Sequence, residues 1–112
     1  MFKEREALYL QDIIDSIQNI ESYTHGFTFE QFSRDQKTQD AVLRNLEVIG
    51  EAARYVTKET KKNYSEIPWR QIVGMRNKVI HEYFGIDLKI LWKTTQEDIP
   101  YLEKNIKKIL EA

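Results

Sequence analysis

Apolar residues recur at spacings of three and four along most of this 112-residue chain, and that period constrains the fold more than any other feature. It is the period of an α-helix that buries one face, whereas a half-buried strand alternates at every second residue. The chain has only four glycines and two prolines, and it contains no Asn-Gly or Asp-Gly hairpin turn. We therefore expect an all-α fold, a compact up-and-down antiparallel bundle of four to five helices.

Glycine and capping signals divide the first half of the chain. A first helix is predicted over about 3–23, and Gly26 ends that segment. Two overlapping capping boxes, Thr28 with Gln31 and Ser33 with Gln36, predict a short turn of helix and then a restart. A second helix is predicted over about 36–57. The polar stretch that follows it predicts a connector with room for one loose turn.

Proline and glycine also mark the second half. Pro68 suits the first position of a third helix, and Gly85 suits its C-terminal end. Asp87 can cap a fourth helix, and Pro100 is expected to kink or split the last segment. We find no internal repeat, low-complexity run or boundary, so a single domain over 1–112 is expected.

Composition limits the classes of function. Hydrophobic residues make up 41% and charged residues 31% of the chain, which is typical of a globular protein. The chain has no cysteine, no apolar signal-peptide core and no run of 18 apolar residues, so we expect a soluble cytoplasmic protein without membrane contact. The formal net charge is −1, so any nucleic-acid contact needs a local patch, and no DNA partner is expected.

The predicted third helix carries polar residues in an unusual place. One apolar arc of it comprises Ile72, Val73, Met75, Val79, Ile80, Tyr83 and Phe84. Arg76 falls inside this arc, where an unpaired buried charge costs several kcal/mol, so it needs a partner or a cleft. Asn77 and His81 lie one turn apart at the edge of the arc.

The predicted second helix is apolar around most of its circumference, which suggests that it is covered on more than one side. Its remaining face is a charged stripe of Arg44, Glu47, Glu51 and Arg54. This stripe could face a cleft or a partner subunit, and Glu47 or Glu51 could pair with Arg76 if the two helices are adjacent.

Each of these features also has a purely structural interpretation. The arginine can belong to a structural ion pair, and the histidine can be a rim residue. The stripe can be helix-stabilising pairs at spacings of three and four, and Tyr83 can be core. The pattern alone leaves both interpretations open.

The motifs that the chain lacks limit the chemistry it can perform. The chain has no cysteine, no H-E-x-x-H, no Walker loop and no G-x-G-x-x-G, so neither a metal nor a nucleotide cofactor is expected. A Ser-His-Asp arrangement has no local support. An Arg, a His and an Asn on one helix suit cleavage of RNA without a metal. The ribose 2′-OH is then the nucleophile, a histidine exchanges protons and an arginine binds the phosphate oxygens.

The segment from Arg76 to Tyr83 reads RNKVIHEY and resembles the R-x-x-x-x-H-x-Y signature of HepT-like proteins in the HEPN superfamily. The surrounding segments strengthen this resemblance: YLQDI, FSRDQKTQDAVLRNLEVIGEAAR and IPWRQIVGMRNKVIHEYFGID. The similarity extends from about Leu8 to the last helix.

The resemblance implies a HEPN-type bundle that acts as a homodimer and cleaves RNA without a metal in a shared cleft. It implies that the chain is the toxin of a HEPN/MNT (type VII) toxin–antitoxin system, partnered by a minimal nucleotidyltransferase (MNT) antitoxin. Carried over residue by residue, Arg76 and His81 would be catalytic, Asn77 a supporting polar residue, and Tyr83 the site at which the antitoxin attaches AMP. Two alternatives are a non-catalytic helical dimer that binds and regulates the nucleotidyltransferase, and a nucleotide-binding accessory subunit.

Overall fold

The structure, a computed structural model, describes residues 4–75, 80–81 and 85–112, with only the backbone for 80, 81, 85 and 86. Three long helices dominate it: α1 (Glu4–Thr24), α3 (Gln36–Arg54) and α8 (Ile99–Glu111). The shorter elements are α2 (Phe29–Ser33), α4 (Lys58–Asn63), α5 (Trp69–Val73), β1 (Ile80–His81), β2 (Gly85–Ile86), α7 (Leu88–Lys93) and the π-helical segment η1 (Thr94–Asp98). The predicted all-α bundle is confirmed, with two two-residue strands as the only strands of the described part.

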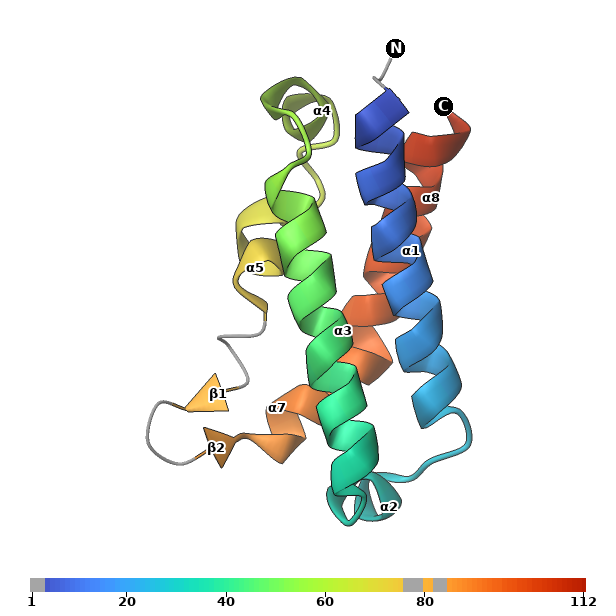
Figure 1. Ribbon diagram of the computed structural model, residues 1–112, viewed down its shortest axis with the longest axis vertical. Helices are drawn as coiled ribbons and strands as arrows, with labels where there is room; N and C mark the ends of the chain where they lie inside the picture. The colour runs from blue at the N-terminus through green and yellow to red at the C-terminus, as the bar shows by residue number, and fades with distance from the viewer. Residues whose placement is uncertain (1–3, 76–79, 82–84) are drawn as a thin grey trace.

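The helix α1 packs against both α3 and α8 and runs antiparallel to them, whereas α3 and α8 run in the same direction (Figure 1). Buried apolar residues of all three helices form the core. Leu10, Ile17, Leu46, Ile49 and Ile106 are all fully buried there. The helix α3 packs against α1 on one side and against α5 on another, which confirms the expectation that it is covered on more than one side. Among the described residues, no helix is long and apolar enough to cross a membrane.

The turn between α1 and α3 follows one of the two predicted capping boxes. Thr28 and Gln31 cap α2 reciprocally, as expected, after Gly26 takes a positive φ of 77°. The second predicted box is wrong, because the carboxylate of Asp35 caps α3 and accepts from the Thr38 N–H. The hydroxyl of Ser33 instead donates to a carbonyl within its own helix.

The polar connector after α3 is more ordered than one loose turn. Thr57 caps the helix α4 and also donates from its N–H and hydroxyl to the carboxylate of Glu6 on α1. Glu6 is buried, and these two hydrogen bonds compensate for the cost of removing its charge from water. The connector is therefore fixed to the start of the bundle.

The last third of the chain follows the predicted caps. Asp87 caps α7, as expected, by accepting from the Ile90 N–H. The helix then widens into η1 immediately before Pro100, where the Ile99 N–H donates to the Thr94 carbonyl five residues back. A π-helical segment thus marks the position at which Pro100 was expected to kink or split the helix.

The predicted third helix is wrong in length. Pro68 precedes the helix α5 as its N-cap, but α5 ends at Val73, with Gly74 at its C-cap. Backbone pairing then joins Ile80 to Ile86 and His81 to Gly85 in antiparallel register, so Gly85 lies in a strand and does not end a helix. Glycine weakens a helix interior and β-branched residues favour strands, so local propensity overrides the helical spacing in this segment.

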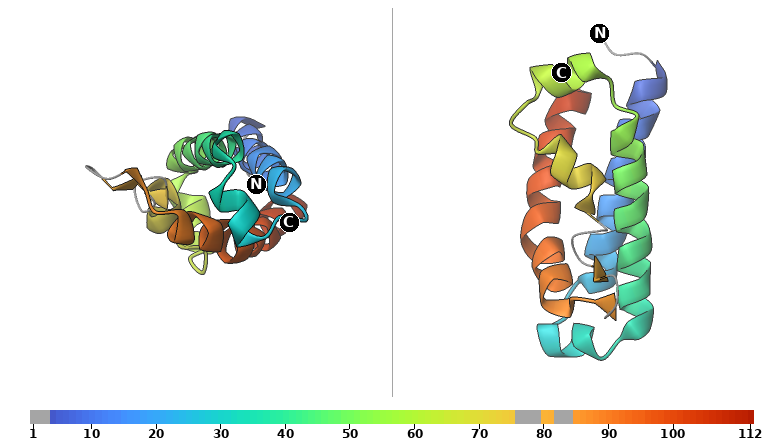
Figure 2. Two further views of the ribbon diagram at one scale, coloured as in Figure 1. Left: turned by 90° about the horizontal axis from the view of Figure 1, so that it is seen from below. Right: turned by 90° about the vertical axis from the view of Figure 1, so that its left-hand side faces the viewer.

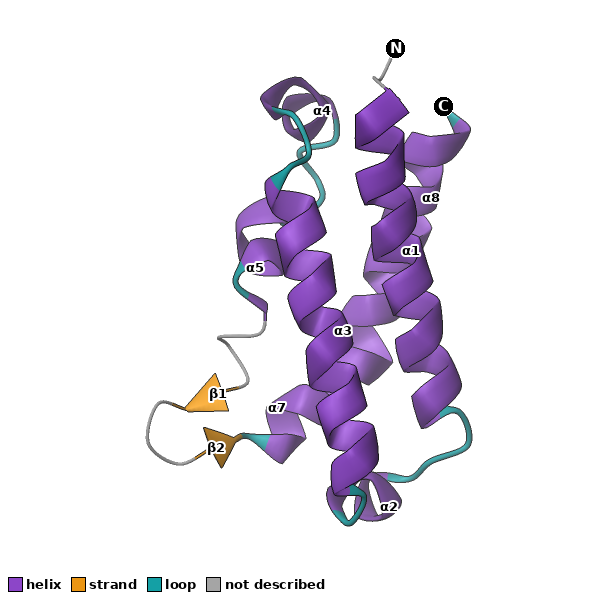
Figure 3. Cartoon of the chain, in the orientation of Figure 1, coloured by secondary structure: helices purple, strands orange, loops and turns teal. Residues whose placement is uncertain are grey.

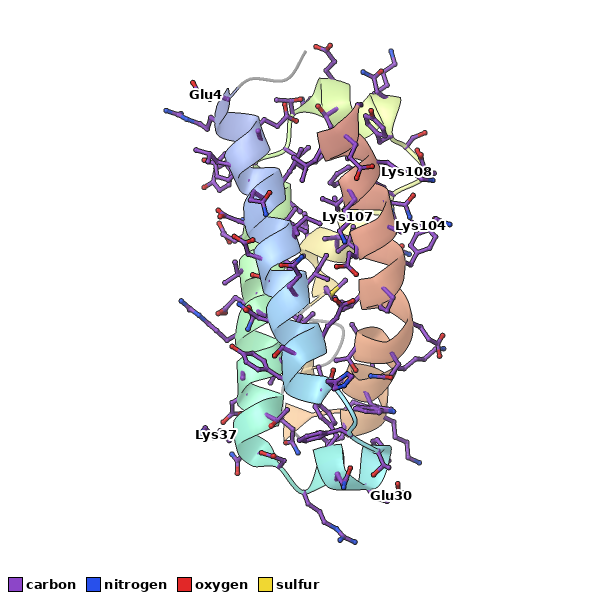
Figure 4. All side chains as sticks on the ribbon, turned by 90° about the vertical axis from the view of Figure 1, so that its right-hand side faces the viewer. Glu4, Glu30, Lys37, Lys104, Lys107 and Lys108 are labelled. Atoms are coloured by element: carbon purple, nitrogen blue, oxygen red, sulfur yellow. The ribbon has the colours of Figure 1, made fainter. Side chains whose placement is uncertain are left out.

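One interface between α1 and α8 contains two carboxyl groups. Glu21 on α1 hydrogen-bonds Glu103 on α8, and the Lys107 ammonium lies 3.4 Å from a Glu103 carboxylate oxygen. Figure 4 shows Lys107 between the two helices, while Lys104 and Lys108 lie on the outer side of α8. Burial, the hydrogen bond to Glu103 and its negative charge raise the pKa of Glu21 to about 7, and Lys107 opposes them.

A pH dependence of stability follows from this pair. Because the pKa of Glu21 is higher in the folded state, the unfolded state ionises first, and the free energy of unfolding falls between about pH 4.5 and 7. We expect Glu21→Gln to raise the free energy of unfolding at pH 8 by about 1 kcal/mol, a small value because water partly screens the pair. Near pH 4 the same change should leave the free energy of unfolding unchanged. Chemical denaturation at pH 4 and pH 8 measures the two free energies of unfolding, with Glu111→Gln as a control. An equal effect of Glu21→Gln at the two pH values would contradict the prediction.

Candidate functional site

The short helix α5 leads directly into the segment that carries the R-x-x-x-x-H-x-Y motif, and its position is fixed by α3. A Cβ atom on Gly50 would lie 2.9 Å from the carbonyl oxygen of Val73 and 3.3 Å from that of Ile72. The backbones of the two helices therefore meet at a point where only glycine fits. Figure 2 (right) shows α5 lying between α3 and the chain of α7, η1 and α8.

The motif itself is only partly within the described residues. Arg76, Asn77 and Tyr83 lie outside them, so their predicted roles stay predictions. The backbone of His81 lies in β1, next to Gly85 of β2. Figures 2 (left) and 3 show that these two strands extend from the side of the bundle on which α5 and α7 lie. The position of His81 is therefore at an edge of the molecule.

The charged stripe of α3 faces outward. The guanidinium of Arg44 and the carboxylate of Glu47 lie 4.0 Å apart, with side chains 75% and 49% exposed. Together with Glu51 they line a shallow hollow of about 430 Å³ against α1. Tyr9 and Tyr55 also line it, and their stacked rings have centroids 5.2 Å apart. So exposed an ion pair contributes little to stability. The predicted pairing of Glu47 or Glu51 with Arg76 involves a residue outside the described part.

A second cavity, of about 460 Å³, lies beside α5 and was not predicted from the sequence. It lies between α5, η1 and α8 and is lined by Arg70, Ile72, Met75, Asp98, Tyr101 and Leu102, among others. Its residues come from segments far apart in the chain, so no local spacing signals it. Met75 lines this cavity and immediately precedes Arg76, so the cavity adjoins the start of the motif.

The described residues contain no group of three His, Asp or Glu side chains placed to hold a metal ion. The charged groups at the cavity beside α5 are Arg70 and Asp98. Those at the hollow between α1 and α3 include Arg44, Glu47 and Glu51 of the charged stripe.

The sequence matches a known family along most of its length. Residues 13–109 match the HepT-like family, described as "Ribonuclease HepT-like". A protein of Thermococcus cleftensis named "Probable ribonuclease HepT" is 48% identical over 101 residues, covering 90% of this chain and 92% of the relative. Proteins named as candidate RNases from Caldanaerobacter subterraneus and Methanocaldococcus jannaschii are 42% and 37% identical. The first alignment covers 92% of both chains, and the second covers 95% of this chain and 97% of its relative. No solved structure matches the chain.

An extended helical bundle, a match over residues 13–109 and near full-length relatives together define the class of this protein. The chain belongs to the HepT-like ribonuclease family. The resemblance inferred from the motif and its surrounding segments is thereby confirmed.

Proposed function

We propose that this protein is a metal-independent endoribonuclease that uses Arg76 and His81. The observation that carries the proposal is the R-x-x-x-x-H-x-Y motif within a chain of the HepT-like ribonuclease family. The position of β1 at an edge of the bundle supports it, because a long single-stranded substrate needs a site that is not enclosed by helices.

The proposed reaction is an internal transfer at phosphorus. A histidine accepts the proton of the ribose 2′-OH, the 2′ oxygen attacks the adjacent phosphorus, and the bond to the 5′ oxygen breaks. The leaving 5′ oxygen takes up a proton, and the products are a 2′,3′-cyclic phosphate and a 5′-hydroxyl. Arg76 binds the non-bridging oxygens as charge builds on them. Asn77 supports the same site by hydrogen bonding.

Two histidines serve this reaction better than one, because one must accept a proton while the other donates. The chain offers one motif histidine, His81, so a homodimer with two motifs in a shared cleft would supply both groups. We therefore propose that the active form is a homodimer.

The system to which such a chain would belong is a HEPN/MNT toxin–antitoxin pair. In this proposal the chain is the toxin, and a nucleotidyltransferase neutralises it by attaching AMP to Tyr83. The added phosphate would place negative charge two residues from His81, where the RNA phosphate has to bind, and would repel it.

The test of the ribonuclease proposal is cleavage of single-stranded RNA by the purified, unmodified protein in excess chelator. We expect cleavage to persist in the wild type and to be lost in Arg76→Ala. Full cleavage by Arg76→Ala, or none by the wild type, would contradict the proposal. A wild type that forms a stable complex with the nucleotidyltransferase but does not cleave RNA would favour the non-catalytic alternative.

Modification of Tyr83 makes a separate prediction. Incubation with the cognate nucleotidyltransferase and ATP is expected to add one or more AMP groups to the wild type and none to Tyr83→Phe, as measured by intact mass. RNA cleavage by Tyr83→Phe should then resist the antitoxin and ATP, whereas wild-type cleavage should be blocked. Tyr101→Phe, a change at an exposed tyrosine on α8, is the matched control and should be modified like the wild type.

A further inference from the structure

The cavity beside α5 has the lining and the volume of a site for a small, partly apolar ligand. Its apolar lining includes Ile72, Met75 and Leu102, each less than a tenth exposed. Tyr101 lies at its α8 side with half of its surface exposed, 51%, although it is a large aromatic residue. A volume of about 460 Å³ lies within the usual range for small-ligand sites and accommodates one planar base with room for its sugar.

The charges around the cavity favour a base over a phosphate as its occupant. Arg70 on α5 is exposed and lines the cavity, but Asp98 of η1 lines it as well. The negative charge of Asp98 repels a phosphate inside the cavity, whereas a neutral base carries no charge to be repelled. Arg70 is left to contact the phosphate that precedes or follows the base in the chain.

Connectivity links this cavity to the proposed reaction. Met75 lines the cavity, and the next residue along the chain is Arg76. The cavity that Met75 and Tyr101 share therefore adjoins the motif along the chain, which suits a base next to the phosphate proposed to bind Arg76. Recognition of single-stranded RNA commonly stacks unpaired bases on tyrosine rings and arginine planes.

We propose that the cavity between α5, η1 and α8 is a base-binding subsite for single-stranded RNA, with Tyr101 as the stacking surface and Arg70 as the phosphate contact. This inference rests on the proposed ribonuclease function and deepens it by placing one nucleotide of the substrate. Tyr101 is here a binding residue and takes no part in proton transfer.

The test uses the His81→Ala protein, which is expected to bind RNA without cleaving it. The probes are fluorescein-labelled single-stranded oligouridylate and oligoadenylate. Methyl-¹³C methionine labelling adds a direct readout, because the chain has only two methionines, Met75 in the cavity and Met1 at the terminus. Titration with either probe should shift the Met75 methyl signal by ring currents and leave that of Met1 in place.

Substitutions then separate stacking from charge. Adding Tyr101→Ala should weaken binding between about fivefold and a hundredfold, while Tyr101→Phe should stay within about twofold of the parent. Tyr23→Ala, at an exposed tyrosine of α1 that does not line the cavity, is the control and should bind as the parent does. Arg70→Gln should reduce the slope of log affinity against log salt by about 0.7, as expected for one lost phosphate contact.

The possible failures are distinguishable. If wild type cleaves RNA but the Met75 signal does not move and Tyr101→Ala binds normally, the subsite is wrong and the ribonuclease function stands. If the Met75 signal moves on concentrating the protein without RNA, a second copy covers the cavity and the subsite is again wrong. If wild type does not cleave and the His81→Ala protein does not bind, both proposals fail.

Discussion

His81→Ala is expected to lower the rate of RNA cleavage by about 10²- to 10⁴-fold, the usual contribution of a positioned proton-transfer group. Within the R-x-x-x-x-H-x-Y motif, the imidazole of His81 is the group that can exchange protons near neutral pH. The 2′ oxygen is a poor nucleophile while it keeps its proton. The measurement is the initial rate of cleavage of a fluorescent oligoribonucleotide at saturating and at limiting substrate. Because the loss concerns a step of the reaction, it should appear in kcat with little change in KM.

The matched control is the other histidine. His25 follows α1 directly, at the turn that leads to Gly26, and the proposed reaction does not use it. His25→Ala should therefore cleave RNA at close to the wild-type rate. Equal losses in the two variants would show that the effect is not specific to the motif and would contradict the assignment of His81.

Gly50→Ala is expected to have the second largest effect, although the residue lies on α3 and carries no functional group. The added methyl would lie 2.9 Å from the carbonyl oxygen of Val73, closer than atoms tolerate, so α5 or α3 has to shift. Overpacking of this kind costs about 1–3 kcal/mol of stability. Val73 lies three residues before Arg76, so the shift also displaces the start of the motif, and a displacement of about 1 Å can cost about 10²-fold in rate.

A structural and a positioning effect of Gly50 are told apart by spectroscopy well below the unfolding temperature. In the folded Gly50→Ala protein, the imidazole signals of His81 should move, while those of His25 serve as the unaffected reference. Gly74→Ala is the matched glycine change, because its Cβ would lie at an ordinary 3.6 Å from the Arg70 carbonyl oxygen. It should leave the His81 signals in place. Unchanged His81 signals and cleavage in Gly50→Ala would show that α5 does not position the motif.

The long helices were predictable because their signals are local and repeated. The first was expected over about 3–23 and extends over Glu4–Thr24, while the second was expected over about 36–57 and ends at Arg54. Each has several turns of apolar spacing and a clear end, such as the positive φ of Gly26. The Asp87 cap was predictable for the same reason, since a capping carboxylate acts within three residues.

The segment after Pro68 shows where such reasoning fails. Apolar residues over 72–84 have helical spacing, but a short apolar run fits a strand equally well, and the backbone pairing of Ile80 with Ile86 resolves it. The π-helical turn over Thr94–Asp98 has no sequence signal beyond the proline that follows it. Ring stacking of Tyr9 on Tyr55 depends on tertiary packing between α1 and α3.

The candidate site likewise has a part that was predictable from the sequence and a part that was not. Arg76, His81 and Tyr83 were found because they form a motif with fixed spacing. The close approach at Gly50 and the cavity beside Tyr101 were missed, because each depends on contacts between helices that lie far apart in the chain. Charged residues such as Glu47 were noticed by pattern, and the structure places them in an exposed pair at a separate hollow.

In the proposed reaction, the RNA's own 2′-OH is the nucleophile and no metal takes part. The measurement that tests this reaction uses two substrates of the same sequence in excess chelator, one an oligoribonucleotide and the other its 2′-deoxy analogue. The ends of the products are identified by mass. We predict cleavage of the RNA alone, with a 2′,3′-cyclic phosphate on one product and a 5′-hydroxyl on the other. Cleavage of the 2′-deoxy substrate, or products with a 5′-phosphate, would contradict this account.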